Sequence, residues 1–157
     1  MMLMIPAPLK AEHDELHATL VEATRQPGAT GEAARHVAQL LHPHFVKEEA
    51  FALPPLGLLG ELASGSMTRE MAEVLPLTQR LKAELGTMLR EHLLIVEALE
   101  KLRAAAQRQH LPEYEAFADA LILHARTEEQ VLYPAAILVG EYVARVLEVD
   151  APTATTR

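Results

Sequence analysis

The sequence predicts an all-α fold, a four-helix bundle, and three observations indicate it. Four segments carry apolar residues at alternating spacings of three and four, which is the spacing of one buried helical face. No segment shows the sustained period-two alternation of a half-buried strand. Half of the 157 residues are hydrophobic but only 4% are aromatic. Leu, Ala, Val and Met therefore dominate, a composition that suits helices.

The first two predicted helices are bounded by proline and glycine. The first covers about 8–26 and ends before a Pro-Gly pair at 27–28, a strong breaker. The second begins near Thr30, which we expect to cap its N-terminus, and ends at the two prolines at 54–55. Pro43 lies inside this helix, so we expect a kink there with one backbone hydrogen bond lost.

The second half of the chain repeats this plan after a loop rich in Gly and Ser, expected over about 56–67. The third helix is expected from Thr68 to about 109, and Pro76 either bends it or marks its true start. The fourth opens with Pro112 in a favoured first-turn position and runs to about 148. Pro134 is expected to kink the fourth helix.

Each predicted helix carries one apolar stripe on which polar residues also fall. In chain order the stripes comprise Leu9, His13, Leu16, Leu20 and Ala23; Val37, Leu41, His44, Glu48 and Phe51; Leu81, Leu85, Met88, His92, Ile95, Leu99 and Leu102; and Tyr114, Phe117, Leu121, His124, Glu128, Val131, Ala135 and Leu138. A stripe of this kind faces the interior of a bundle. We therefore expect four His and two Glu side chains to be buried.

One arrangement of polar residues occurs twice. The segments 44–49 and 124–129 share the pattern His-x-x-x-Glu-Glu, and a proline follows each of them. A Glu-His pair stands upstream of each copy, at 12–13 and at 91–92. Residues four apart on a helix lie about 40° apart around the axis and about 6 Å along it, so the side chains of each His-x-x-x-Glu unit converge.

Burial of these side chains predicts a metal site. A carboxylate buried among apolar side chains loses much of its hydration energy and must be paired, protonated or bound to a metal. No Arg or Lys falls on the four stripes, and a hydrogen-bonded polar network without metal is the alternative. Imidazole and carboxylate together suit iron, manganese or zinc. The candidate metal ligands are His13, His44, Glu48, His92, His124 and Glu128.

These six residues, in this order, resemble the hemerythrin-like (HHE cation-binding) domain family. The family pattern is a His on the first helix, His-x-x-x-Glu on the second, a His on the third and His-x-x-x-Glu on the fourth. The resemblance covers about 9–140 and implies an up-down-up-down four-helix bundle with a non-haem di-iron centre. Oxygen-carrying hemerythrins have a fifth His where this chain has Val96. Members that repair iron–sulfur centres usually add a Cys-bearing segment, and this chain has no Cys.

The resemblance also implies roles for the ligands. Two iron ions would be bridged by Glu48, Glu128 and an oxide or hydroxide, and manganese and zinc suit the same ligands. Two octahedral ions have roughly twelve coordination positions, of which the protein fills about eight and the bridge about two. About two positions then remain for dioxygen, nitric oxide, peroxide or water. The implied ligand pairs, one for each ion, are His13 with His44 and His92 with His124.

Several polar residues near the stripes have two readings. His17 lies next to a stripe rather than on it, so we prefer His13 as the ligand from the first helix. The remaining His residues fall off the stripes and are expected in solvent: His36, His42 and His110. Four glutamates stand beside the candidate ligands, and they either face solvent or hydrogen-bond a ligating imidazole: Glu12, Glu49, Glu91 and Glu129.

Composition narrows the class of protein. The net charge of −8 argues against a nucleic-acid surface, and the lack of Cys excludes disulfides, thiolate catalysis and iron–sulfur ligation. We find neither a secretory signal nor an apolar run of membrane-spanning length. We therefore expect a cytoplasmic protein with one domain at 1–149 and a flexible tail at 150–157. A homodimer through 56–71 and the long third helix is also compatible with the sequence.

Three functions follow from these expectations. The leading one is a di-iron protein that binds or senses dioxygen, nitric oxide or iron. The second is a di-iron enzyme that reduces peroxide or nitric oxide or repairs iron–sulfur centres. The third is a metal-free helical interaction module whose buried His residues respond to pH. The sequence leaves open whether a small diatomic ligand or peroxide is only bound or is also turned over.

Overall fold

The computed structural model describes residues 2–148, and every regular element in that range is helical. The predicted all-α class is therefore confirmed for this range, while the predicted tail at 150–157 lies outside it. The α-helices are α1 (Ala7–Thr24), α2 (Gly28–Lys47), α3 (Leu59–Ala63), α4 (Leu75–Arg108), α5 (Pro112–Thr127) and α6 (Tyr133–Val146). The other elements are the π-helical turns η1 (Glu48–Ala52) and η4 (Glu128–Leu132) and the 3-10 helices η2 (Pro54–Leu58) and η3 (Arg69–Val74).

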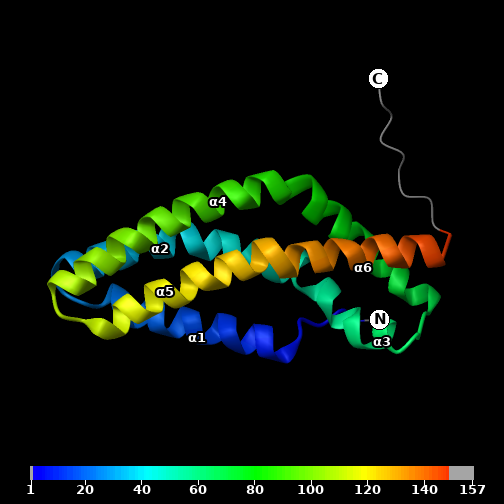
Figure 1. Cartoon of the computed structure of the whole chain (residues 1–157), viewed down its shortest axis with the longest axis horizontal. Helices are drawn as coiled ribbons and strands as arrows, with labels where there is room; N and C mark the ends of the chain where they lie inside the picture. The colour runs from blue at the N-terminus through cyan, green and yellow to red at the C-terminus, as the bar shows by residue number, and fades with distance from the viewer. Residues whose placement is uncertain (1, 149–157) are drawn as a thin grey trace, which may run out of the picture.

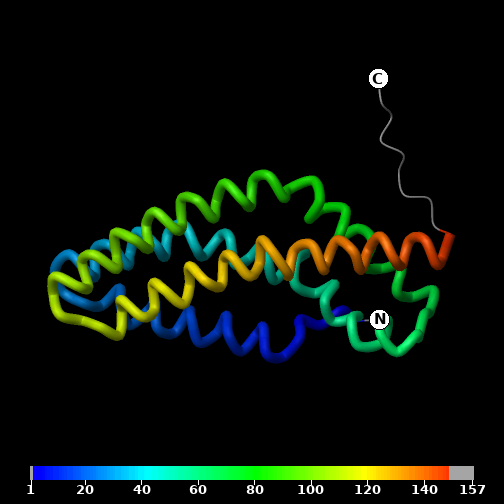
Figure 2. The backbone as a smooth tube through the Cα atoms, viewed as in Figure 1, coloured from blue at the N-terminus to red at the C-terminus, as the bar shows by residue number. Residues whose placement is uncertain are grey.

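Helices α1, α2 and α4 and the line formed by α5 and α6 run along one another (Figure 1). Helix α1 packs against α2, α2 against α4, α4 against α5, and α5 back against α1. This closed ring of contacts is compatible with a four-helix bundle. Beyond the ring, α6 continues the line of α5 and packs against α4, while α3 and its neighbouring 3-10 helices lie at that same end (Figures 1 and 2). Within 2–148 no helix combines the length and apolar character needed to cross a membrane.

Helix boundaries differ from the expectations at several points. Helix α2 begins at Gly28, and Thr30 is buried inside it, where its backbone N–H donates to Gln109 Oε1 at 2.8 Å instead of capping the helix. The expected loop at 56–67 is largely helical, because η2 and α3 occupy most of it. Pro76 stands in the first turn of α4 and so marks its start. Pro43 lies inside α2, and the kink there stays a prediction.

Both copies of the repeated pattern end in a π-helical turn that sequence reasoning missed. The wide turns are closed by backbone N–H groups donating five residues back, from Leu53 to the Glu48 carbonyl at 2.9 Å and from Tyr133 to the Glu128 carbonyl. Each donor stands directly before a proline, whose missing N–H cannot continue the α-helical ladder. A π turn holds one residue more than an α turn, so the helical face shifts by one residue beyond it.

This shift overturns the last part of the predicted fourth stripe. Val131 and Leu138 were expected inside, but they are 56% and 65% exposed. The residues that are buried instead lie one or two positions further along the chain: Tyr133, Ala136 and Val139. The extra residue of η4 is the physical reason, since it rotates α6 relative to α5. A π turn directly precedes Pro134, which stands in the first turn of α6, and the kink expected there stays a prediction.

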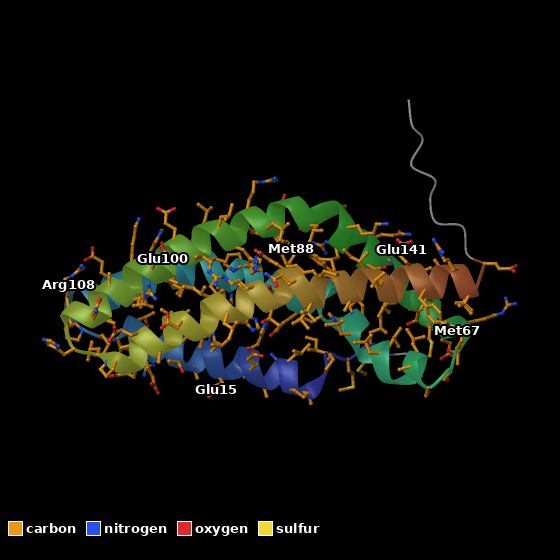
Figure 3. All side chains as sticks on the ribbon, viewed as in Figure 1. Glu15, Met67, Met88, Glu100, Arg108 and Glu141 are labelled. Atoms are coloured by element: carbon orange, nitrogen blue, oxygen red, sulfur yellow. The ribbon has the colours of Figure 1, made fainter. Side chains whose placement is uncertain are left out.

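The apolar core is divided into clusters, and the six candidate ligands lie between two of them. On α4, His92 stands between Met88 of one cluster and Ile95 of the other. On α2 and η1, His44 and Glu48 likewise stand between Leu41 and Phe51. Figure 3 shows Met88 on the inside of the molecule and Glu15 and Glu100 on its surface. The polar residues are therefore enclosed by apolar packing on both sides.

Candidate metal centre

All six candidate ligands are buried, although they come from every segment of the ring. Glu48 is 0% and Glu128 1% exposed, and each is the first residue of its π turn. The imidazoles come from α1, α2, α4 and α5 with 2%, 1%, 2% and 4% exposure: His13, His44, His92 and His124. Two carboxylates are thus removed from water, which costs several kcal/mol for each unless a cation compensates the charge.

The structure brings the six residues into two groups that share both carboxylates. Each group offers four ligand atoms within 4.8 Å of one another. The His13–His124 group comprises His13, His124, Glu48 and Glu128, and the His44–His92 group comprises His44, His92, Glu48 and Glu128. The expected pairing of His13 with His44 and of His92 with His124 is therefore wrong. Each pair joins helices that are distant in sequence, and spacing along the chain carries no signal for that.

Each carboxylate reaches both groups through its two oxygens. Glu48 Oε1 is 2.8 Å from His44 Nε2, and Glu48 Oε2 is 3.4 Å from His13 Nε2. Glu128 Oε1 is 3.5 Å from His92 Nε2, and Glu128 Oε2 is 3.3 Å from His124 Nε2. Within the His13–His124 group, the Nε2 atoms of the two imidazoles approach to 3.2 Å. A carboxylate placed in this way can join two ions, one in each group.

Each of the four imidazoles also contacts a glutamate with its other nitrogen. We call these residues the outer glutamates: Glu12, Glu49, Glu91 and Glu129. The Nδ1 atoms of His124 and His92 lie 2.7 and 2.9 Å from Glu12 and Glu129. The corresponding distances to Glu49 from His13 and to Glu91 from His44 are 3.4 and 3.3 Å. Of the two readings left open for these glutamates, the structure supports the hydrogen-bonding one.

The outer glutamates determine which ring nitrogen of each imidazole carries a hydrogen. A carboxylate only accepts, so each Nδ1 carries the donated hydrogen, and Nε2 is the nitrogen that faces the interior and would bind a metal once it has lost its proton. Two lysines contact two of the outer glutamates, Lys10 with Glu49 at 3.0 Å and Lys47 with Glu91 at 3.1 Å. The contacts repeat between the two halves of the chain. Glu12 contacts His124 of the second His-x-x-x-Glu unit, and Glu91 contacts His44 of the first.

Electrostatics reflect two buried carboxylates surrounded by imidazoles. Burial alone would lower the pKa of His92, but hydrogen bonds to Glu128 and Glu48 raise it to about 10. Burial likewise opposes protonation of His124, yet its contacts with Glu128 raise its pKa to about 9. Burial would raise the pKa of Glu128, but the nearby imidazoles of His124, His13 and His92 hold it well below the usual range. The site thus favours positive charge between its carboxylates.

Two carboxylate oxygens remain without a hydrogen-bond partner among the described residues, Glu48 Oε2 and Glu128 Oε2. Both are the oxygens that face the His13–His124 group. Buried charged oxygens without partners are costly, whereas a cation bound between the imidazoles would satisfy both. The buried His and Glu side chains can therefore hold a metal ion.

Two further residues of the site were missed by sequence reasoning. Tyr133 is fully buried and its hydroxyl donates to Glu48 Oε1 at 2.5 Å. Phe45 stacks on His13, with ring centroids 4.0 Å apart and planes 7° apart. Tyr133 lay off the predicted stripe because the π turn was not foreseen. The His residues expected in solvent are exposed, namely His36, His42 and His110, and so is His17, which was not preferred as a ligand.

Comparison with known proteins assigns neither a family nor a function to this chain. A scan against protein-family models, a search of curated proteins and a search of solved structures found no match for this chain. Any function must therefore be argued from the site itself.

Proposed function

We propose that this chain is a hemerythrin-like protein that holds two iron ions and binds or senses dioxygen, nitric oxide or iron. One observation carries the proposal: eight buried ligand positions form two groups, and both carboxylates belong to both groups. The order of the six ligands along the chain supports the hemerythrin-like assignment. The ring of helix contacts supports its up-down-up-down topology.

The ligand set favours iron over the alternatives. Each group offers two imidazole nitrogens and two carboxylate oxygens, a donor mix of intermediate hardness. Thiolates are absent from the chain, so soft ions have no preferred ligand. Structural zinc sites are closed tetrahedra that usually include Cys. Iron, by contrast, takes six ligands, so positions remain for a small ligand beyond those that the protein fills.

The surrounding residues suit a site of this kind. The outer glutamates orient all four imidazoles, as hydrogen-bonded carboxylates do beside metal-binding His residues. Apolar clusters on both sides exclude bulk water and hold the helices that carry the ligands. When bound, iron supplies redox chemistry and affinity for small diatomic ligands, while the chain fixes the geometry and the polarity around it.

Metal content together with the absorption spectrum of the oxidised protein tests the proposal. After iron-supplemented expression we expect two iron ions per chain and the near-ultraviolet absorption of an oxygen-bridged ferric pair. Substitution His92→Ala should abolish the spectrum, and the exposed His36→Ala serves as the matched control. A wild-type chain without metal would contradict the proposal, and sustained peroxide reduction with an added reductant would make the protein an enzyme rather than a binder.

Chelation provides a second test. A ligand present at about 100 times its dissociation constant stabilises the folded state by about 2.7 kcal/mol for each site. For two sites in a domain of this size, removal of the metal should lower the Tm by about 10–20 °C. Differential scanning calorimetry with and without chelator measures the change. An unchanged Tm would favour a metal-free helical module instead.

A further inference from the structure

Tyr133 is the one phenol that reaches the candidate ligands within the described part of the chain. Its side chain is fully buried. The hydroxyl oxygen lies 2.5 Å from Glu48 Oε1, 3.2 Å from His92 Nε2 and 3.4 Å from His44 Nε2. These three atoms all belong to the His44–His92 group. A residue that served only as a donor to Glu48 would not need to approach both imidazole nitrogens as well.

The distances match those between neighbouring ligands of one ion. Bonds from such ions to nitrogen and oxygen are about 2.0–2.2 Å long, so two ligand atoms at right angles lie about 3 Å apart. Within the same group, His44 Nε2 and Glu48 Oε1 are 2.8 Å apart. The hydroxyl oxygen of Tyr133 therefore stands where a further ligand of that group would stand.

We propose that Tyr133 is a phenolate ligand of the metal ion in the His44–His92 group. This inference rests on the proposed function, because it requires that the group binds iron. Coordination replaces the phenol O–H bond by an O–Fe bond and releases one proton to solvent, so no oxidant or reductant is needed. The His44–His92 group then has five protein ligands, whereas the His13–His124 group has four. The exchangeable positions lie mainly at the His13–His124 group.

The repeated pattern explains why only one group gains a phenol. Leu53 stands five residues after Glu48, as Tyr133 stands five residues after Glu128, and each closes a π turn. Leu53 has no atom that can bind a metal. A cavity of about 180 Å³ is lined by His13 of the other group, together with Phe45 and Glu49 among others. The open coordination position and the cavity thus lie in the same half of the centre.

Resonance Raman and visible absorption of the iron-loaded, air-oxidised full chain test this assignment. Phenolate bound to ferric iron gives a visible charge-transfer band with enhanced tyrosinate vibrations. We expect both in the wild type and neither in Tyr133→Phe, with two iron ions per chain in each protein. The controls Tyr142→Phe, at a half-exposed position, and Tyr114→Phe, at a buried one, should keep the band.

Each outcome separates this inference from the proposed function. A wild-type chain with two iron ions and no tyrosinate vibrations would overturn the ligand role and leave the di-iron proposal standing. A wild-type chain without iron would overturn both. If Tyr133→Phe fails to fold, the two control variants decide the question. The chain has three tyrosines, so a band that persists in both Tyr114→Phe and Tyr142→Phe comes from Tyr133. Persistence of the band in a folded Tyr133→Phe variant would also overturn the assignment.

Discussion

The two ligand groups share their carboxylates but differ in the aromatic residue beside them. In the His13–His124 group Phe45 stacks on His13 at 4.0 Å. In the His44–His92 group Tyr133 lies beside His92, with ring centroids 5.7 Å apart, and turns its hydroxyl to the ligand atoms. The repeated residues thus supply two groups that could each hold a metal ion. The residues that break the repeat distinguish the two groups. The apolar ring of Phe45 covers His13 in one group, and the phenol of Tyr133 lies beside the ligand atoms in the other.

The largest predicted effect comes from the carboxylates that the two groups share. Glu48→Gln or Glu128→Gln should weaken both metal positions together, by more than the roughly 10–100-fold that loss of an outer contact costs. Metal titration followed by calorimetry measures this. The exposed Glu97→Gln is the control. Loss of metal from one position only in either variant would contradict the claim that both groups share the carboxylates.

The outer glutamates sharpen the comparison within each group. The shorter contacts are those of Glu12 and Glu129, at 2.7 and 2.9 Å, and the longer ones involve the carboxylates that lysines also contact. Competition from a lysine weakens the hold on the imidazole. We therefore expect Glu12→Gln and Glu129→Gln to reduce metal affinity by about 10–100-fold.

The matched variants Glu49→Gln and Glu91→Gln should have smaller effects, because their contacts with His13 and His44 are longer, at 3.4 and 3.3 Å. Competition titrations with a chromophoric chelator rank the four variants. A ranking in which the two lysine-paired positions matter most would contradict this account of the outer contacts.

The metal-free chain should show a pH dependence with contributions from both groups. The folded-state pKa values of His92 and His124 are raised to about 10 and about 9, above the ordinary value of 6.5. A group whose pKa is higher in the folded than in the unfolded state stabilises the fold fully below its unfolded-state pKa, here 6.5. This contribution is lost as the pH rises through the folded-state pKa. The Tm of chelator-treated protein should therefore fall between pH 6.5 and about 10.

The sign of this effect distinguishes the metal-free from the metal-bound protein. Binding of metal displaces the protons, so metal affinity should rise over the same pH range. Thermal scans at several pH values, with and without iron, measure both trends. A Tm of the metal-free chain that rises with pH would contradict the charge arrangement described for the two groups.

The smallest predicted effect concerns access to the His13–His124 group. Val46 is 56% exposed and lines the cavity beside His13. Val46→Trp should fill the cavity and slow the binding of azide to the ferric protein by about tenfold, about 1.4 kcal/mol in the barrier. The iron content should stay unchanged. Tyr142→Trp, at a half-exposed position on α6, is the control, and equal azide rates in both variants would place the entry route elsewhere.

Much of the fold follows from local patterns in the sequence. Burial of His13, His44, Glu48, His92 and Glu128 was predictable because apolar residues at spacings of three and four define the inner face of each helix. The doubled His-x-x-x-Glu unit, together with the stripe positions of His13 and His92, was likewise sufficient to predict which residues can hold a metal ion. These features depend only on residues within one helix, which a sequence pattern describes well.

The rest depends on geometry that no single helix contains. The pairing of His13 with His124 is set by the contact of α1 with α5, not by spacing along the chain. The π turn at Glu128 shifts α6 by one residue and brings Tyr133 inside, where a regular helix would have buried Val131. The proline that follows Tyr133, matched by the one after Leu53, was the available signal, because a proline removes a backbone donor from the ladder.

Anomalous diffraction at the iron edge, from crystals of the iron-loaded chain, tests the central claim most directly. We predict two peaks per chain, one between His13 and His124 and one between His44 and His92, with Glu48 and Glu128 contacting both. A single peak, or peaks outside these two groups, would contradict the account of a shared two-metal centre.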